Sequence, residues 1–381
     1  MANGKQAKIC ELYDVGLFDL DGVLYRGNEP VPYASQSLAR IRRGNFAAVF
    51  VTNNASRVPE VVAQQLVSLG VDASPDDILS SAHIGVSLAQ SLCGKNAKVL
   101  LCGAQGLYRA ASEAGLTIVD SADDNPQAVI HGFSPEANWE MLSEAVLAIG
   151  KGACYIATNL DRFIPRERGL MLGVGSFAAA ITHATGVTPI SGAKPEPQMF
   201  RHAAEKAHAH APLVIGDNLE TDIRGGYASG FPTLHVLTGG HTPRDVICAP
   251  VPERPRYLAD DLRCLDEHYP DIELVDDGGN VRATISASDT HIDHEAFASQ
   301  AAQGNFFAVR IGKDLASYDN NAVTIGHTTY PLDKENAHGI ELTVNEYRAF
   351  VHALWLVLDT NPSSRQTIER YLPDVKVRHH D

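Results

Sequence analysis

The stretch Val15-Gly16-Leu17-Phe18-Asp19-Leu20-Asp21-Gly22 decides the fold, because a short apolar run leads into two carboxylates and a glycine. Apolar runs of this length before a turn residue are typical of buried strands. Asp19 and Asp21 are two residues apart, so their side chains lie on the same side of an extended chain. The stretch predicts a buried strand that ends in a nucleophile and a proton donor. An ordinary acidic strand exit before a glycine turn is the alternative.

Three later segments carry further polar groups at the ends of apolar runs. Val49–Asn54 ends in a hydroxyl and two amides, which can hydrogen-bond to phosphate oxygens. Gly192–Pro197 places a lysine just before a proline-marked helix start, and Leu213–Asp222 supplies two more carboxylates. Taken singly, these groups also fit a strand-end cap, a solvated lysine and acids at a helix N-terminus. Four such segments in one order favour a single catalytic set.

The four segments resemble the four signature motifs of the haloacid dehalogenase superfamily, whose phosphatases have Asp-x-Asp-Gly as their first motif. A further segment, Ala157–Asp161, resembles the cap signature of one subfamily and is followed by the spaced residues Pro165, Gly169 and Gly173–Gly175. That subfamily contains NagD, para-nitrophenyl phosphatases, pyridoxal phosphate phosphatases and glycerol-3-phosphate or phosphoglycolate phosphatases. Leu160 and Leu172 stand where the subfamily commonly has proline, in the part that faces substrate. The resemblance covers about residues 10 to 260.

The resemblance implies a catalytic role for four side chains. Asp19 is expected to attack phosphorus and form an aspartyl-phosphate, which splits one difficult step into two. Asp21 is expected to protonate the leaving alkoxide and then to deprotonate the water that cleaves the intermediate. Thr52 is expected to hold the phosphoryl oxygens, while Lys194 neutralises the charge on them and on Asp19.

The same acidic groups predict a metal site. Four clustered carboxylates would repel one another strongly without a cation, and Mg²⁺ prefers oxygen ligands. The ligands expected from the resemblance are Asp19, the main-chain carbonyl of Asp21 and Asp217, with Asp222 as a ligand or as support for the ligands.

Substrate binding is assigned to two further sets of residues. Asn53 and Asn54 follow Thr52 and are expected to bind phosphate. Four residues flank the cap signature and are the first candidates for substrate choice, although each also fits a role in holding the cap loop together: Asn159, Asp161, Arg162 and Arg166.

We predict an α/β fold with a doubly wound parallel-sheet core of the Rossmann-like, haloacid dehalogenase type. Alternating strands and helix-like stretches place this catalytic core at 1–82 plus 186–265, with a last core strand near 233–237. A second α/β set at 83–185 comes before the third and fourth motifs. It is therefore expected to be an inserted α/β cap domain over the strand ends.

The chain changes character after about residue 265, so 268–381 is expected to be a small accessory α/β domain. Thr343 and Glu346 have capping-box spacing, and the apolar residues that follow recur on one helix face. We find no Gly-x-Gly/Ala phosphate loop there, and we expect the region to support assembly or core stability without chemistry of its own. Its other predicted elements are strands at 272–275, 281–285 and 306–311 and a helix at 293–303.

Composition excludes several classes of function. A formal net charge of −15 argues against a nonspecific binder of nucleic acid or of anionic membranes. No apolar run approaches the roughly 18 residues of a membrane span, and the polar N-terminus lacks a signal-peptide core, so a cytoplasmic location is predicted. The 6 cysteines lack Cys-x-x-Cys spacing and imply no zinc site. A single chain and a homo-oligomer both fit the sequence.

The sequence therefore predicts an enzyme, a Mg²⁺-dependent phosphoric monoester hydrolase acting on a small phosphorylated metabolite. Glycerol 3-phosphate is the first choice of substrate, because that activity occurs in the resembling subfamily, including members with extra C-terminal regions. Nucleotides, pyridoxal phosphate and phosphoglycolate are the alternatives. From a different class, a catalytically silent phosphometabolite sensor would keep the same fold.

Overall fold

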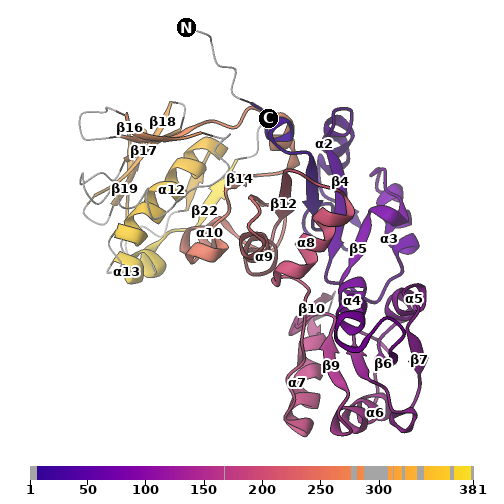
Figure 1. Ribbon diagram of the computed structural model, residues 1–381. Helices are drawn as coiled ribbons and strands as arrows, with labels where there is room; N and C mark the ends of the chain where they lie inside the picture. The colour runs from indigo at the N-terminus through magenta and orange to yellow at the C-terminus, as the bar shows by residue number, and fades with distance from the viewer. Residues whose placement is uncertain are drawn as a thin grey trace.

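The computed structural model describes residues 7–166, 168–275, 281–286, 308–311, 313–319, 322–332, 339–360 and 364–378. Figure 1 shows three regions, each built on a sheet: a central region, an inserted region below it and a C-terminal region beside it. No helix in these ranges is long and apolar enough to cross a membrane.

A six-stranded parallel sheet forms the central region, and the predicted first strand, β1, lies inside it. Leu17 belongs to a hydrophobic cluster on one face, and its neighbour Phe18 belongs to a second cluster on the other. Burial on both faces explains the continuous apolar runs in the sequence. In spatial order the strands are β14 (Tyr257–Ala259), β13 (Thr233–Val236), β12 (Pro212–Gly216), β1 (Val15–Phe18), β4 (Ala47–Thr52) and β5 (Ile78–Ser80).

The strand predicted near 233–237 is confirmed as β13, but the prediction that it is the last core strand was wrong, because β14 follows it at the sheet edge. Its three residues are too short a run to stand out in the sequence. Helices surround the sheet, and proline occupies the first turn of three of them, where it has no hydrogen bond to lose. They are α1 (Ile9–Leu12), α2 (Ala34–Ile41), α3 (Pro59–Ser68), α8 (Pro197–Lys206), α9 (Arg224–Ser229) and α10 (Pro243–Cys248), with a small hairpin β2 (Tyr25–Arg26) and β3 (Glu29–Pro30).

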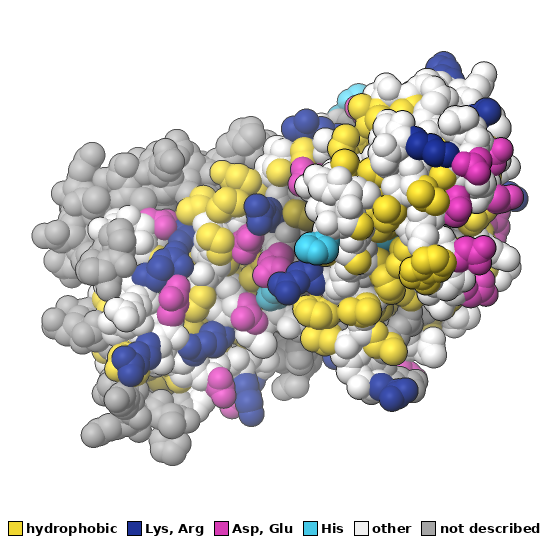
Figure 2. Space-filling view, turned by 90° about the horizontal axis from the view of Figure 1, so that it is seen from below, with side chains coloured by type: hydrophobic (Ala, Val, Ile, Leu, Met, Phe, Trp, Pro, Cys, Tyr) yellow, Lys and Arg dark blue, Asp and Glu magenta, His cyan; other side chains and the backbone are white. Residues whose placement is uncertain are grey.

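The inserted region follows β5 and contains a four-stranded parallel sheet. The strands are, in spatial order, β7 (Thr117–Val119), β6 (Lys98–Cys102), β8 (Ala128–His131) and β9 (Cys154–Ala157). Its helices are α4 (Ser81–Cys93), α5 (Gln105–Glu113), α6 (Trp139–Gly150) and α7 (Val174–Thr185). An antiparallel hairpin, β10 (Phe163–Arg166) with β11 (Gly169–Leu172), lies where this region meets the central one (Figure 1). Figure 2, seen from below, shows apolar side chains on this side of the molecule.

The C-terminal region contains a six-stranded antiparallel sheet, with both strands at 272–275 and 281–285 as predicted. The predicted helix at 293–303 lies outside the described residues, and the strand predicted at 306–311 is described from Ala308. In spatial order the strands are β16 (Val281–Ile285), β15 (Ile272–Val275), β17 (Ala308–Ile311), β18 (Asp314–Asp319), β19 (Ala322–Ile325) and β20 (Thr328–Pro331). The remaining elements are β21 (Ile340–Leu342) paired with β22 (Val375–Val377), α12 (Val344–Thr360) and α13 (Ser364–Tyr371).

Helix α12 begins with the predicted capping box. The Thr343 amide donates to Glu346 Oε2 at 2.7 Å, and the Glu346 amide donates to Thr343 Oγ1 at 3.3 Å. The sequence predicted one apolar face, but the structure buries nearly every residue of α12. The reason is that α12 packs against β17 and β18 and also against α10 of the central region (Figure 1).

Three polar contacts fix α12 to the central region. In one of them the Arg348 guanidinium donates to the Leu258 carbonyl of β14 at 2.7 Å. The Trp355 indole donates to the Val246 carbonyl at 3.1 Å, and the Arg254 guanidinium bonds to Asp359 at 2.7 Å. One hydrophobic cluster includes Val246 and residues from α12 and from the antiparallel sheet. The C-terminal and central regions therefore share a core.

Candidate active site

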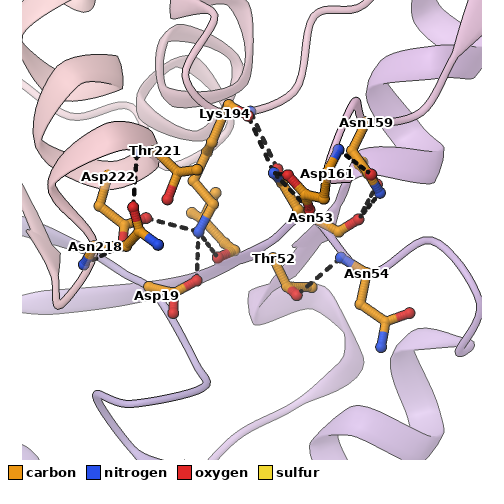
Figure 3. Close-up of polar contacts among 12 residues, drawn as sticks. Asp19, Thr52, Asn53, Asn54, Asn159, Asp161, Lys194, Asn218, Thr221 and Asp222 are labelled. Atoms are coloured by element: carbon orange, nitrogen blue, oxygen red, sulfur yellow. Dashed lines mark hydrogen bonds and ion pairs between the residues drawn. The ribbon is translucent and has the colours of Figure 1, made fainter. Parts of the chain in front are cut away.

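Four charged side chains meet at the carboxyl ends of β1 and β12, and Figure 3 shows three of them, Asp19, Lys194 and Asp222. Asp19 follows β1 directly and Asp217 follows β12 directly. Asp222 lies in η3, a π-helical turn (Leu219–Ile223), and Lys194 lies in the loop before α8. Carboxyl ends of parallel strands face one edge of a sheet, and this is where ligands bind in doubly wound folds. The structure therefore brings together residues that are up to 203 positions apart in the sequence.

Lys194 is buried in the centre of this cluster, with 4% of the residue exposed. Its ammonium donates to Asp19 Oδ1, to Asp222 Oδ1 at 2.8 Å and to the Val51 carbonyl at 3.3 Å. Burial alone would lower the pKa of Lys194, but the carboxylates of Asp19 and Asp222 raise it further than burial lowers it. Lys194 is therefore a charged ammonium at neutral pH.

Asp217 and Asp222 are buried carboxyl groups whose pKa values are raised. Burial raises the pKa of Asp217 well above its usual range, and the negative charges of Asp19 and Asp222 raise it further. Burial also raises the pKa of Asp222, although Lys194 opposes the shift. The Gly239 backbone lies very close to Asp217. A Cβ on Gly239 would lie 1.8 Å from Asp217 Oδ2. Only glycine fits at that position.

The donor set fits a hard divalent cation. One carboxylate oxygen from each of Asp19, Asp217 and Asp222 lies within 4.8 Å of the others, which is the one such grouping in the part of the chain that the structure describes. Carboxylate oxygens without sulfur or imidazole suit Mg²⁺. Asp222 accepts a bond on each oxygen, from Lys194 and from the Asn218 amide at 3.2 Å. Asp19 accepts a bond from Lys194 on Oδ1, and Asp217 accepts a bond from the Gly240 amide on Oδ2.

Asp21 lies outside this grouping and is exposed on the loop after β1. The next residue, Gly22, turns the chain with a φ of +90° and donates its amide to the Tyr25 carbonyl at 2.7 Å. A Cβ on Gly22 would lie 2.5 Å from the Asp217 carboxylate. The turn therefore holds the Gly22 backbone against Asp217, and Asp21, the residue before it, stays exposed.

The hydroxyl and amides after β4 have different surroundings. Thr52 is buried, and its Oγ1 accepts the Asn54 amide at 3.1 Å. The Asn53 side chain contacts the Lys194 backbone and Asp161. The Asn54 side chain points away from the charged cluster (Figure 3) and accepts bonds from the amide and hydroxyl of Ser56.

The candidate cap residues divide into two groups. Asn159 and Asp161 reach the central region, where Asn159 Nδ2 donates to the Asn53 carbonyl at 2.8 Å. Burial raises the pKa of Asp161. Arg162 is exposed, and its guanidinium stacks over the Phe163 ring at 5.4 Å. Arg166 ends β10, and its side chain lies outside the description.

Sequence reasoning missed three groups that position the cluster. The Asn218 side chain accepts the amides of Glu220 and Thr221, which caps the turn that carries Asp222. Its signal was present, because asparagine before an acidic run is typical of a helix N-cap. The Gly240 amide and the Val51 carbonyl are backbone groups, and no side-chain pattern announces them.

Comparisons with known proteins agree with this geometry. Residues 16–117 match the family described as haloacid dehalogenase-like hydrolase, and residues 192–265 match a related HAD-hydrolase-like family. The D-glycerol 3-phosphate phosphatase of Mycobacterium tuberculosis is 40% identical over 308 residues, which cover 73% of this chain and 86% of that protein. The acid sugar phosphatase of Staphylococcus saprophyticus is 34% identical over 254 residues, or 66% of this chain and 95% of that protein.

Solved structures give the same result. A glycerol phosphate phosphatase from Mycobacterium tuberculosis, solved with magnesium, has a TM-score of 0.73 and 31% identity and covers 96% of this chain and 99% of its own. The p-nitrophenyl phosphatase from Archaeoglobus fulgidus has a TM-score of 0.62 and 28% identity and covers 66% of this chain and 98% of its own. The chain therefore belongs to the haloacid dehalogenase-like hydrolases, and within them to the Mg²⁺-dependent phosphatases that cleave phosphoric monoesters.

Proposed function

We propose that this phosphatase hydrolyses glycerol 3-phosphate. The observation that carries the proposal is the extent of the match. The Mycobacterium tuberculosis D-glycerol 3-phosphate phosphatase aligns with 73% of this chain, and the magnesium-bound glycerol phosphate phosphatase structure covers 96% of it. The acid sugar and p-nitrophenyl phosphatases cover 66%. The structural likeness to the glycerol phosphate phosphatase therefore extends over nearly the whole chain, whereas these two other phosphatases leave about a third of it unmatched.

The proposed chemistry begins at Asp19. Lys194 donates to one of its oxygens, which orients the carboxylate for attack on phosphorus. The bond from phosphorus to the alkoxide breaks as the new bond to Asp19 forms, and Asp21 gives its proton to the leaving oxygen. Asp21 then takes a proton from water, which attacks phosphorus, releases phosphate and regenerates Asp19. The buried Thr52 hydroxyl and the Lys194 ammonium stabilise the phosphoryl oxygens.

We assign the metal ligands from the contacts. Asp19, Asp217 and the main-chain carbonyl of Asp21 would hold Mg²⁺, and Asp222, already bonded on both oxygens, would support Lys194 and the turn around it. Bound Mg²⁺ supplies positive charge beside the developing charge of the transition state. Removal of Mg²⁺ with a chelator is expected to stop turnover.

We also propose that the chain divides into three domains. The parallel sheets support a core at 1–82 plus 186–265 and a cap at 83–185, and the antiparallel sheet supports an accessory domain at 268–381. A cytoplasmic location and the choice between a single chain and a homo-oligomer stay predictions. Arg162 and Arg166 remain the proposed substrate-selecting residues of the cap.

A second substrate class has support of its own. The acid sugar phosphatases are 33–35% identical, so phosphorylated sugars are the second candidate. Pyridoxal phosphate, phosphoglycolate and nucleotides are less favoured, and a silent sensor would not need the complete set of reacting groups that is present.

The test is phosphate release from a panel of these compounds, with p-nitrophenyl phosphate as a reference. We expect glycerol 3-phosphate to have the highest kcat/KM, and Asp19→Asn to abolish every activity. A higher kcat/KM for a sugar phosphate would contradict the proposal and make that compound the better candidate substrate. Phosphate release that is unchanged in Asp19→Asn would show that this cluster is not the active site.

A further inference from the structure

We infer that Asn53 is a positioning residue, which holds the Lys194 loop in place and transmits the position of the cap to it. In this view Asn159 and Asp161 act on the reaction through Asn53 and do not contact the substrate. The inference rests on the proposed function, because it assumes that Lys194 acts on the phosphoryl group. It assigns a different task to three residues that the sequence suggested as phosphate or substrate ligands.

The contact between Asn53 and Lys194 is a matched pair of hydrogen bonds. The Lys194 amide donates to Asn53 Oδ1 at 3.1 Å, and Asn53 Nδ2 donates to the Lys194 carbonyl at 3.0 Å. A carboxamide has a donor and an acceptor side by side, so it can bind both polar groups of one residue's backbone. The Lys194 backbone is therefore fixed at both ends. Its side chain extends from there to Asp19 and Asp222.

The backbone of Asn53 is fixed in turn from the cap side. Its carbonyl accepts Asn159 Nδ2 at 2.8 Å and the Ser81 hydroxyl at 2.6 Å. Ser81 opens α4, the helix that leads into the inserted region, and Asn159 lies in the loop after β9. The first residue of the entering helix and the end of the inserted sheet thus bind the same carbonyl oxygen.

Asp161 completes the junction. Its two carboxylate oxygens each lie 3.4 Å from Asn53 Nδ2, and its amide donates to Asn159 Oδ1 at 3.1 Å. Figure 3 shows Asn53, Asn159 and Asp161 grouped on one side of Lys194, with Asp19 and Asp222 on the other. A shift of the cap loop would therefore move Asn53 and, through its two bonds, the Lys194 backbone.

This arrangement predicts that a substitution in the junction lowers the rate of hydrolysis by the same factor for every substrate. A small displacement of the ammonium from Asp19 weakens the stabilisation of the phosphoryl group, which all substrates share. A residue that contacts the variable part of the substrate would instead change the order of preference. Movement of the cap would also change the rate of the chemical step through Asn53 and Lys194, without a contact between these cap residues and the substrate.

The test compares Asn53→Asp, Asp161→Asn and the double variant Asn53→Asp/Asp161→Asn. Asn53→Asp keeps the shape and the acceptor but removes the donor and places a second carboxylate against Asp161. We expect kcat to fall about 10- to 100-fold, more than KM changes, because misplacement of a catalytic group by about 1 Å costs rates of this size. Asp161→Asn should lose less. The double variant exchanges donor and acceptor between positions 53 and 161 but does not restore the bond to the Lys194 carbonyl. It should therefore recover only part of the loss, at least about fivefold over Asn53→Asp, as expected for side chains in contact.

Three measurements separate this inference from its rivals. The ratio of kcat/KM for glycerol 3-phosphate to that for p-nitrophenyl phosphate should stay constant in all variants. Thermal unfolding should show that each variant is folded, and Asn45→Asp, an exposed asparagine in the turn before β4, is the matched control and should keep full activity. If Asn53→Asp does not fold, Asp161→Asn still decides the matter by its effect on that ratio.

A changed order of substrates in Asp161→Asn, or a double variant whose loss is the product of the single losses, would overturn the inference. Asp19→Asn is assayed in parallel. If it stays active, the proposed function fails. If it is dead while Asn53→Asp is fully active, only the positioning role fails.

Discussion

The central parallel sheet and the C-terminal antiparallel sheet are both six-stranded, yet only the first gathers chemistry at one edge. In the parallel sheet, β1, β4 and β12 all run the same way, so Asp19, Thr52 and Asp217 lie at a single edge, at or just after the strand ends. In the antiparallel sheet successive strands end at opposite edges. Within the described residues of that sheet no comparable grouping of metal-binding side chains occurs.

The burial patterns differ in the same way. All four residues of β1 are buried, whereas β17 and β19 alternate between buried and half-buried residues. The antiparallel sheet therefore has one face against α12 and another that is more exposed. The comparison teaches that strand direction separates the two tasks: the parallel sheet positions reacting groups, and the antiparallel sheet adds buried apolar surface to a shared core.

The largest expected effect tests the chemical half of this comparison. Asp19→Asn should lower kcat by at least about 10⁴-fold, because loss of a nucleophile removes the whole covalent route. The melting temperature should stay near that of the wild type or rise, since one of several clustered carboxylates is neutralised. Phosphate release and thermal unfolding measure the two quantities. Retention of more than about a tenth of the activity would remove Asp19 from the central role.

Asp21→Asn should give the next largest effect. The loss should be about 10²- to 10⁴-fold for glycerol 3-phosphate, the range for a positioned general acid, and clearly smaller for p-nitrophenyl phosphate. The reason is that p-nitrophenolate leaves with little need for a proton. Kinetics with both substrates give the comparison, and equal losses would contradict the acid role.

Trp355→Ala should show the opposite pattern, with large loss of stability and small loss of rate. Trp355 is 2% exposed, and its indole bonds to Val246 across the shared core. Truncation of a buried tryptophan should lower the free energy of unfolding by about 3–5 kcal/mol. Urea unfolding measures this change, with kcat measured well below the transition. An unaffected unfolding midpoint would show that the two regions do not share a core.

The smallest expected effect is a pH dependence in the inserted region. Burial lowers the pKa of His131 to about 4, below its usual 6.5, and its ring bonds to the Tyr155 hydroxyl at 3.0 Å. As pH falls, the unfolded chain therefore takes up this proton before the folded protein does. The contribution of neutral His131 to the free energy of unfolding is complete above pH 6.5 and is lost as pH falls toward about 4. His131→Asn should show a shallower fall of the unfolding free energy across that window than the wild type. An identical slope would mean that His131 does not carry the effect.

Much of this arrangement could be predicted from the sequence, and the reasons for the rest are physical. Continuous apolar runs gave β1, β4 and β12, because burial on both faces leaves no polar positions in such strands. The Thr343 capping box gave the start of α12, since its signal is local. β14 has only three residues and was missed.

The contacts of Asn53 could not be predicted, because its partners Lys194 and Asp161 are 141 and 108 residues away. An amide after a strand fits a phosphate ligand and a backbone clamp equally well in sequence. The second face of α12 was missed for the same reason: α10, which covers it, is about a hundred residues earlier in the chain.

The central claim is that the parallel sheet delivers Asp19 as a nucleophile to a phosphate ester. Its most direct test is to quench the enzyme with acid during turnover of glycerol 3-phosphate with Mg²⁺, reduce the acyl phosphate with borohydride and map the altered residue by mass spectrometry. The account predicts modification at Asp19 that depends on both substrate and Mg²⁺. Modification at a different residue, or none while turnover continues, would contradict it.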